Sequence, residues 1–434
     1  MTVTGPALLD DVFARLDDDL DAALAVLAEH VAQPSVSSTG EGVRAAAEQL
    51  RARMEACGFA GRVVETAGHP AVVGRRPGPP GAPRLVFYGH YDVQPAAAAD
   101  GWSSAPFAPE QRDGRVYGRG SADNKGQHLA VLHGLHALLA AHPGLPIDLT
   151  VIVDGEEEIT SPSLGPVLAA HRSAVGADLV VATDGALHPS GAPTVVRGCR
   201  GLVYLDVSAV GADRDLHGGT YGGAVDNAVT LLVGALASLH AADGTVAVAG
   251  FADGALAPDP DPRDPDGRRP VLVPHVGLAG IGGGHQGPGM KTVVPHRAHA
   301  KVECRLVPGQ SAVRVGALVA AHLERFRGVS ARVIGVTEPY RCAPGDPVLD
   351  EVAAAIGSAG GAEPVVVTSL GGTLPLAVLA EGLDAPVLLV PLAGADQNNH
   401  GVDENLRVDD FRYGMRAAAA IAAAVARRSE EEQR

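Results

Sequence analysis

The chain has 434 residues, of which 46% are hydrophobic, and its 50 Asp and Glu against 34 Lys and Arg give a net charge of −16. This much apolar material excludes an intrinsically disordered chain. The acidic balance argues against nucleic acid or a membrane surface as a partner, because both attract clustered Lys and Arg.

The cysteines and the apolar runs indicate a compartment. Cys57, Cys199, Cys304 and Cys342 lie far apart in the chain and form no Cys-x-x-Cys pair, which is typical of a reducing environment. No basic stretch followed by an apolar one opens the chain, so we expect no signal peptide. No apolar run reaches the ~20 residues that span a bilayer. We therefore expect a soluble, cytoplasmic protein.

Helical and strand-like segments alternate along most of the chain. Leu20, Leu24, Leu27 and Val31 share one helical face, and Pro34 marks the end of that helix. Further helices are expected near 43–57, 126–141, 162–172, 347–358, 373–382 and 408–427, and buried strands at 85–88, 149–153, 179–182 and 387–390. This alternation predicts an α/β fold with a mainly parallel, helix-covered sheet.

The alternation changes between residues 198 and 336. Val203, Leu205 and Val207 alternate with more polar residues, as in a half-buried strand. The other elements expected here are a strand at 301–307 and helices near 226–240 and 311–327. Two or three strands with two helices predict a smaller α+β domain, residues 198–336, inserted into a larger domain formed by 1–197 and 337–434.

Residue types that bind metal ions follow several predicted strands. They are His90 and Asp92, Asp123 in a glycine-rich loop, Glu156 to Glu158, Asp184 and, from a distant part of the chain, His400. The carboxyl ends of the strands in an open α/β sheet form the crevice in which ligands bind. We therefore expect these side chains to converge there.

Their chemistry favours a pair of divalent cations. The candidate ligands are two histidines and three carboxylates, namely His90, Asp123, Glu158, Asp184 and His400. If one carboxylate bridges, each ion has three ligands, and such nitrogen and oxygen sets suit Zn²⁺, with Mn²⁺ or Co²⁺ as alternatives. The pKa of a water shared by two ions about 3.5–4 Å apart falls to about 7. A further glutamate supplies a base for that water, and Asp92 has the spacing of a carboxylate that orients the imidazole of His90.

Six motifs carry a family resemblance. They are GHYDVQP (89–95), DGRVYGRGSADNKG (113–126), DGEEE (154–158), DLHGGTYGG (215–223), GPGMKTVVP (287–295) and NNHGVDENL (398–406). In this order, over nearly the whole chain, the sequence resembles the M20 family of dinuclear metallopeptidases, in particular its carnosinase-like and nonspecific cytosolic dipeptidases. The resemblance implies a zinc hydrolase that cleaves the peptide bond of dipeptides or short peptides. It also implies that the inserted domain is a lid through which a homodimer forms.

The resemblance also implies roles for residues. His90, Asp123 and Asp184 would bind one zinc ion, and Asp123, Glu158 and His400 the other, with a cis peptide bond after Asp123. The catalytic roles implied are general base for Glu157, orientation of a ligand for Asp92, and oxyanion stabilisation across the dimer for His217. The substrate-binding residues implied are Thr292, Arg305, Gly372 and Thr373.

Three departures from the family pattern leave the substrate open. Thr160 stands where a glycine is usual, Ser369–Leu370 replaces a charged pair, and Gly335 stands where a histidine is common in carnosinase-like members. An alternative is therefore an N-acyl amino-acid deacylase or desuccinylase-type amidase of the same family. A more distant alternative is a binding protein that has lost its chemistry. Since every expected ligand and the base are present, the sequence favours an enzyme.

Overall fold

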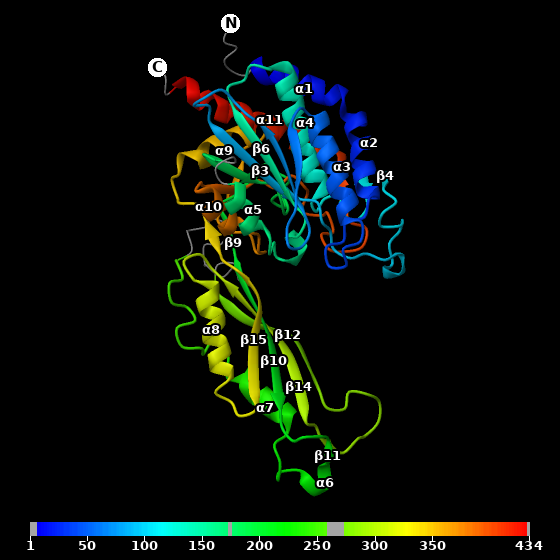
Figure 1. Ribbon diagram of the computed structural model, residues 1–434, viewed down its shortest axis with the longest axis vertical. Helices are drawn as coiled ribbons and strands as arrows, with labels where there is room; N and C mark the ends of the chain where they lie inside the picture. Colours follow the sequence, from blue (N-terminus) through cyan, green and yellow to red (C-terminus); the bar gives the residue numbers. More distant parts are fainter. Residues whose placement is uncertain (1–6, 172–175, 258–272, 432–434) are drawn as a thin grey trace. The chain divides into compact units, whose positions relative to one another are not determined.

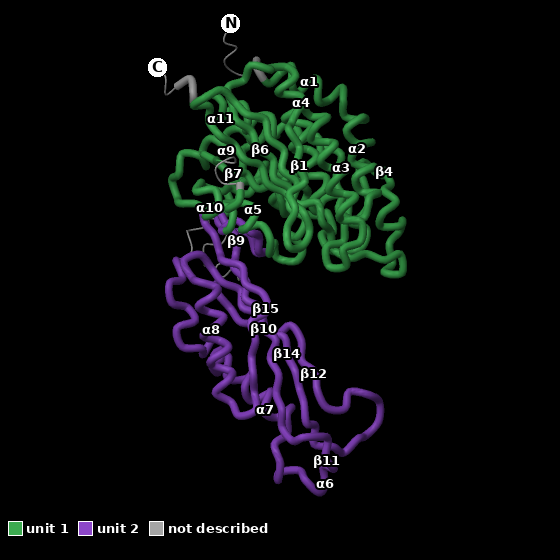
Figure 2. Tube along the Cα trace, in the orientation of Figure 1, with its two compact units in different colours: residues 1–197, 342–367, 378–434 green, residues 198–341, 368–377 purple. Residues whose placement is uncertain are grey.

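The computed structural model describes residues 7–171, 176–257 and 273–431, and the chain forms two compact units (Figure 2). Unit 1 comprises Met1–Arg197, Cys342–Val367 and Val378–Arg434, and unit 2 comprises Gly198–Arg341 and Thr368–Ala377. The sequence placed the junctions after residues 197 and 336. In the structure they fall after Arg197 and Arg341, and the short segment Thr368–Ala377 groups with unit 2.

In the described part of unit 1, eight strands form one sheet in the order β1-β2-β6-β3-β7-β18-β8-β17. They are β1 (Ala60–Val64), β2 (Ala71–Arg76), β6 (Asp148–Asp154), β3 (Arg84–His90), β7 (Leu179–Ala182), β18 (Val387–Leu389), β8 (Thr194–Val196) and β17 (Val365–Val367). The central strands β6, β3, β7 and β18 run parallel to one another and are almost entirely buried. Burial on both faces explains why they are continuous apolar runs in the sequence.

Helices cover this sheet. They are α1 (Ala7–Asp18), α2 (Leu20–Ala32), α3 (Val43–Ala56), α4 (Lys125–Ala141), α5 (Leu164–His171), α9 (Pro347–Gly360), α10 (Leu376–Leu383) and α11 (Val408–Glu431). α4 packs on β3, α3 packs on β1 and β2, and α11 lies along α4 and α9 (Figure 1). The close approach of α11 to α4 requires a glycine, because a Cβ at Gly134 would lie 2.1 Å from the carbonyl oxygen of Met415. The predicted α/β fold with a mainly parallel, helix-covered sheet is confirmed.

A small sheet in unit 1 joins two distant parts of the chain. Its strands are β19 (Asn405–Arg407), β5 (Arg115–Tyr117) and β4 (Glu110–Arg112), in that order. The antiparallel pairing of β19 with β5 places Asn405 opposite Tyr117. The segment just before β19 therefore lies beside the glycine-rich loop that follows β5.

Unit 2 contains a four-stranded antiparallel sheet among its described residues, in the order β12-β14-β10-β15. The strands are β12 (His275–Gly283), β14 (Arg297–Leu306), β10 (Gly201–Val210) and β15 (Val329–Thr337), and the helices α7 (Ala228–Ala237) and α8 (Ala312–Leu323) pack on it. Val203, Leu205 and Val207 face the core, as their alternation predicted. The expectation of two or three strands was wrong because β12, with the sequence HVGLAGIGG, carries glycines where an apolar alternation would have revealed it.

Two further findings concern the helices and the cysteines. Across residues 7–171, 176–257 and 273–431, no helix combines the length and the apolar character that crossing a membrane would need. Cys57, Cys199, Cys304 and Cys342 are all buried, and no disulfide joins them.

Candidate metal centre

Three neighbouring parallel strands of unit 1 end at the same edge of the sheet. β3 ends at His90, which lies opposite Asp154 at the end of β6, and β7 ends at Ala182 beside β3. The residues that follow β6 form the short 3₁₀ helix η2 (Glu157–Ile159). The predicted ligands of this part of the chain therefore converge because their strands are parallel and adjacent.

Side-chain atoms that could bind a metal ion form two groups, and the first contains Glu157, predicted as the base, in place of the shared ligand Asp123. The first group consists of His90, Glu157 and Asp184, and the second of Asp123, Glu158 and His400, and within each group these atoms lie within 4.8 Å of one another. Asp123 faces both histidines, since its Oδ1 lies 3.0 Å from Nε2 of His90 and its Oδ2 lies 3.2 Å from Nε2 of His400. Nε2 of His400 is also 3.2 Å from Oε2 of Glu158. One carboxylate that offers an oxygen to each side is the arrangement a bridging ligand requires.

Exposure differs between the two sides of this centre. The side chain of His90 is fully buried, and those of Asp123 and Glu158 are only 8% and 5% exposed. The imidazole of His400, in contrast, is 52% exposed. Within unit 1 the centre is therefore accessible to solvent on the side of His400.

Asp92 is fully buried and contacts the imidazole of His90 and the backbone of Glu157 and Glu158. Nδ1 of His90 lies 3.0 Å from the carbonyl oxygen of Asp92 and 3.4 Å from its Oδ1. The two oxygens of the same carboxylate accept hydrogen bonds of 3.1 Å from the backbone N–H groups of Glu157 and Glu158. A proton held on Nδ1 by this contact leaves Nε2 of His90 free to bind a metal ion.

The carboxylates raise the pKa of both histidines. Burial disfavours the charged form of His90, but Asp123, Asp184 and Asp92 outweigh it and raise the pKa of this imidazole well above its ordinary value. Hydrogen bonds with Asp123 and Glu158 raise the pKa of His400 to about 10. The centre therefore attracts positive charge strongly.

The pKa values of two glutamates in the centre are also shifted. Burial raises the pKa of Glu157 well above its ordinary value, and the negative charges of Asp184 and Glu158 add to the shift, against the opposing effect of His90. Burial likewise raises the pKa of Glu158. These carboxylates lie close enough to disfavour one another's ionisation, a repulsion that bound cations would relieve.

Asp184 provides a further test of whether metal ions fit. Its Oδ2 is buried and, among the described residues, has no hydrogen-bond partner, although Nε2 of His90 lies 3.5 Å away. A buried carboxylate oxygen without a partner is costly, and coordination of a cation would satisfy it. Together with the nitrogen and oxygen donors, this shows that the residues present fit two divalent cations.

The other predicted site residues belong to unit 2. His217 is exposed at the end of β11 (Leu216–His217), which pairs with β13 (Val293–Val294), and its Nδ1 lies 3.2 Å from Oγ1 of Thr220. Thr292 lies beside it, because its carbonyl oxygen accepts the N–H of Gly218 at 2.9 Å. The structure therefore brings His217 and Thr292 together within unit 2.

Arg305, Gly372 and Thr373 lie elsewhere in unit 2. Nη1 of Arg305 donates a hydrogen bond of 3.1 Å to Oγ1 of Thr373, and the carbonyl oxygen of Gly372 accepts the N–H of Arg200 at 3.2 Å. The guanidinium of Arg305 also pairs with Glu303, at 3.2 Å from Nε to Oε1. A substrate carboxylate that binds Arg305 would have to compete with that internal partner.

Sequence reasoning missed Gln94 and Glu404. Nε2 of Gln94 donates a hydrogen bond of 2.8 Å to Oε2 of Glu158, a predicted ligand. Glu404 is fully buried and binds the loop that carries Asp123. Both residues lie inside motifs that carried the family resemblance, Gln94 in the motif of His90 and Glu404 in that of His400. Their position close to a predicted ligand was the sign of a role that the sequence offered.

The three positions that depart from the family pattern lie in different structural environments. Thr160 has a φ of 76°, in the left-handed region where glycine is favoured, which explains why a glycine is usual at this position. Gly335 lies opposite Tyr204 in the pairing of β15 with β10. Ser369 and Leu370 lie in the Thr368–Ala377 segment, where the N–H of Leu370 donates to the carbonyl oxygen of Gly198 at 2.8 Å.

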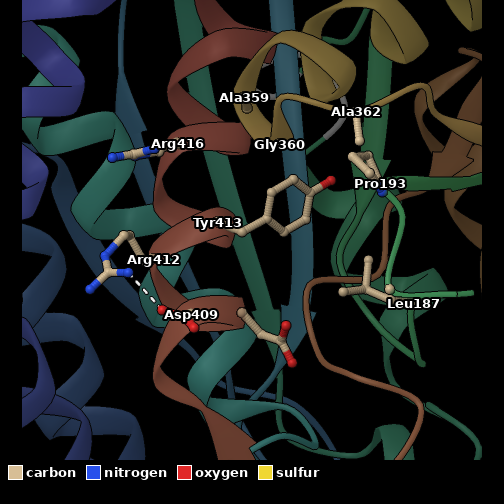
Figure 3. Close-up of a pocket in the computed structure, with 11 residues that line it drawn as sticks. Leu187, Pro193, Ala359, Gly360, Ala362, Asp409, Arg412, Tyr413 and Arg416 are labelled. Carbon is tan, nitrogen blue, oxygen red and sulfur yellow. Dashed lines mark hydrogen bonds and ion pairs between the residues drawn. The ribbon is translucent and has the colours of Figure 1, made fainter. Parts of the chain in front are cut away.

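A separate pocket of about 300 Å³ lies in unit 1, and no residue of the two groups that could bind metal ions lines it (Figure 3). Figure 3 shows Tyr413 extending from α11 toward Pro193 and Ala362. The Tyr413 hydroxyl and Oδ2 of Asp410 are buried without hydrogen-bond partners among the described residues. Ordered water in the pocket would satisfy both groups.

Comparisons with known proteins agree on one family. A family model described as Peptidase family M20/M25/M40 matches residues 86–424. The Beta-Ala-His dipeptidase of Homo sapiens is 29% identical over 78% of this chain and 74% of its own length. The Cys-Gly metallodipeptidase dug1 of Schizosaccharomyces pombe is 28% identical over 80% of this chain and 81% of its own length. The crystal structure of an M20 family metallo-carboxypeptidase from Sulfolobus solfataricus has a TM-score of 0.86 and 27% identity, covering 93% of this chain and 99% of that one.

Proposed function

The chain belongs to Peptidase family M20/M25/M40, and on that basis we propose that it is a metal-dependent dipeptidase that hydrolyses the peptide bond of a dipeptide or short peptide. The observation that carries this proposal is Asp123, whose two oxygens face His90 and His400 while Glu157 lies in the adjacent group. The similar human and yeast proteins are named as dipeptidases, which supports the same class of substrate.

The residues present suggest how the reaction proceeds. His90, Asp184, Asp123, Glu158 and His400 would hold two divalent cations, for which we propose Zn²⁺, with Mn²⁺ or Co²⁺ as alternatives. When bound, such ions polarise the scissile carbonyl and lower the pKa of a shared water.

Glu157 is the proposed general base. Its Oε2 lies 3.9 Å from Nε2 of His90 and its side chain is 13% exposed, so it borders the centre and still reaches solvent. Glu157 takes a proton from the attacking water and returns it to the nitrogen of the leaving amine. Asp92 holds Glu157 through its backbone N–H, so that the carboxylate stays beside the ligands.

We propose that unit 2 completes the site. His217 would stabilise the oxyanion across a homodimer that forms through unit 2, and such a donor contributes roughly 10²–10³-fold to kcat. Thr292 and Arg305 would bind the substrate carboxylate, and Gly372 and Thr373 the substrate backbone. The hydrogen bond from Arg305 to Thr373 supports the assignment of these two residues to one subsite. Arg305 must leave Glu303 to bind an anion.

A cytoplasmic location is part of the proposal. The cysteines are all buried and no disulfide joins them, which suits a reducing compartment.

A second candidate is an N-acyl amino-acid deacylase or desuccinylase-type amidase. The uncharged Ser369–Leu370 pair and Gly335 favour it, because carnosinase-like members commonly carry charged or histidine side chains there. A binding protein without activity is disfavoured, since all the expected ligands and Glu157 are present and lie together.

A substrate panel on the zinc-loaded protein tests the proposal. It contains β-Ala-His, Cys-Gly and unmodified dipeptides, tripeptides with a free C-terminus, and N-acetyl and N-succinyl amino acids. We expect the highest kcat/KM for a dipeptide, and no hydrolysis of any substrate after a chelator has removed the zinc. Preference for the N-acyl compounds would support the second candidate, and hydrolysis of none of them would contradict both.

A further inference from the structure

The carboxylate of Glu404 is fully buried and lies just before β19. Its Oε1 accepts the backbone N–H groups of Ala122 and Asp123, at 3.0 and 2.9 Å. Its Oε2 accepts the backbone N–H of Gly120 at 2.9 Å and Nη1 of Arg119 at 2.8 Å. One side chain therefore holds almost every residue of the loop that ends at the bridging ligand.

We infer that Glu404 is a positioning residue that fixes the loop carrying Asp123, and with it the direction in which the Asp123 carboxylate faces the two histidines. The inference rests on the proposed function, because the positioned groups are the proposed metal ligands. A buried carboxylate is stable only when its charge is compensated, and here the backbone N–H groups and Arg119 provide that compensation. The loop and the carboxylate thus depend on each other.

Arg119 extends this contact to the second histidine. Its Nη2 donates hydrogen bonds of 3.2 Å to the carbonyl oxygens of His400 and Gly401, while its Nη1 binds Glu404. The side chain of Arg119 is 4% exposed, and its Cζ lies over the ring of Trp102, 5.2 Å from the ring centroid. The Glu404–Arg119 pair therefore holds the backbones of Asp123 and His400, which come from distant parts of the chain.

Backbone pairing supports the same arrangement. The N–H of Gly118 donates to the carbonyl oxygen of Glu404 at 2.9 Å, directly before the pairing of β5 with β19. These contacts hold the backbone on both sides of the 3.2 Å approach between Nε2 of His400 and Oδ2 of Asp123. Removal of such outer partners of metal ligands typically costs about 10–100-fold in metal affinity.

Glu404→Gln tests the inference, because the amide keeps the volume but points an NH₂ group at backbone donors. The matched control is Glu338→Gln, since Glu338 also accepts backbone N–H groups, those of Ala312 and Val313, but lies in unit 2. Two quantities are measured: Zn²⁺ affinity by competition with a chromogenic chelator, and amide hydrogen exchange of residues 119–124 in the metal-free protein.

We expect Glu404→Gln to weaken the more loosely bound Zn²⁺ by about 10–100-fold and to speed exchange at residues 119–124. Glu338→Gln should change neither. A purely structural carboxylate would lower the unfolding temperature while leaving Zn²⁺ affinity unchanged, so a folded Glu404→Gln protein with wild-type affinity overturns the inference.

If Glu404→Gln does not fold, Arg119→Lys decides. Lysine keeps the charge but lacks the two guanidinium nitrogens that bind Glu404 and the carbonyl oxygen of His400. We therefore expect weaker Zn²⁺ binding and faster amide hydrogen exchange at residues 400–401. Unchanged affinity in this variant overturns the inference. If the wild-type protein itself binds no Zn²⁺, the proposed function fails, and the exchange comparison alone then decides whether Glu404 orders the loop.

Discussion

The carboxylate of Asp92 accepts a hydrogen bond of 3.1 Å from the backbone N–H of Glu157, and both residues border the same candidate metal centre. The other oxygen of Asp92 accepts the N–H of Glu158 at the same distance. Since Asp92 also contacts Nδ1 of His90, one buried residue holds the proposed ligand histidine and the proposed base together.

Asp92→Asn should therefore weaken metal binding. The amide replaces one of the two acceptor oxygens with an NH₂ group, so a donor would face the backbone N–H of Glu157 or Glu158. The imidazole of His90 also loses its charged neighbour. We expect Zn²⁺ affinity to fall by about 10–100-fold, measured by chelator competition, with kcat reduced even at saturating Zn²⁺. Wild-type affinity in this variant would show that Asp92 does not orient the ligand.

Glu157→Gln tests whether Glu157 acts as a general base or binds a metal ion. If Glu157 transfers the proton, kcat should fall by roughly 10²–10⁴-fold while the protein keeps two ions, as counted by elemental analysis. Glu158→Gln is the matched comparison and should lose metal. Because Glu157 lies in the same group as His90 and Asp184, the loss of an ion from Glu157→Gln would identify it as a ligand instead.

Mixed dimers test whether His217 acts across subunits. His217→Ala and Glu157→Gln proteins should each be nearly inactive alone. After dissociation and reassociation in equal amounts, half of the dimers are mixed and each contains one intact site, so about a quarter of wild-type activity should return in a twofold-symmetric dimer. If no activity returns, His217 acts within its own chain or has no catalytic role.

His133→Leu should make stability less sensitive to acid. Burial lowers the pKa of His133 from 6.5 to about 4, and its Nε2 has no hydrogen-bond partner among the described residues. Between pH 6.5 and pH 4 the unfolded chain takes up a proton at this residue that the folded chain does not. As the pH decreases through this range, His133 therefore lowers the free energy of unfolding by up to about 1.4 kcal/mol per pH unit.

The variant lacks that proton, so its urea midpoint should decline less between pH 6.5 and pH 4.5 than that of the wild type. The ring of His133 packs edge-on against Phe411, and leucine keeps most of that apolar contact. Parallel declines in the two proteins would mean that His133 is already protonated in the folded state.

The sequence allowed parts of the fold and the site to be predicted for clear physical reasons. β7 was predicted with its observed bounds, Leu179–Ala182, because a strand buried on both faces is a continuous apolar run. β8 and β17 have three residues each and carry too little pattern to be recognised. β12 was missed because its glycines interrupt any alternation.

The same contrast holds in the site. His90 and Asp184 were recognisable because they are metal-binding side chains at or just after the end of a buried strand. Glu404 was not, because most of its partners are backbone N–H groups, which every sequence contains and no side-chain pattern reveals. Which residues of unit 2 meet the substrate stays a prediction, because it depends on assembly and ligand as well as on the chain.

Asp123→Ala should remove metal more completely than any other single change at a ligand. Its two oxygens face His90 and His400, so its loss deprives both ions of a ligand. We expect fewer than one Zn²⁺ per chain after dialysis, against two for the wild type, as counted by elemental analysis. Two ions retained per chain would mean that the centre does not depend on a bridge.

Zinc-edge anomalous diffraction from crystals of the zinc-loaded wild-type protein tests the shared carboxylate most directly. We expect two peaks about 3.5–4 Å apart, with Asp123 between them, His90 and Asp184 on one, and Glu158 and His400 on the other. A single peak, or two peaks that Asp123 does not join, would rule out a shared carboxylate.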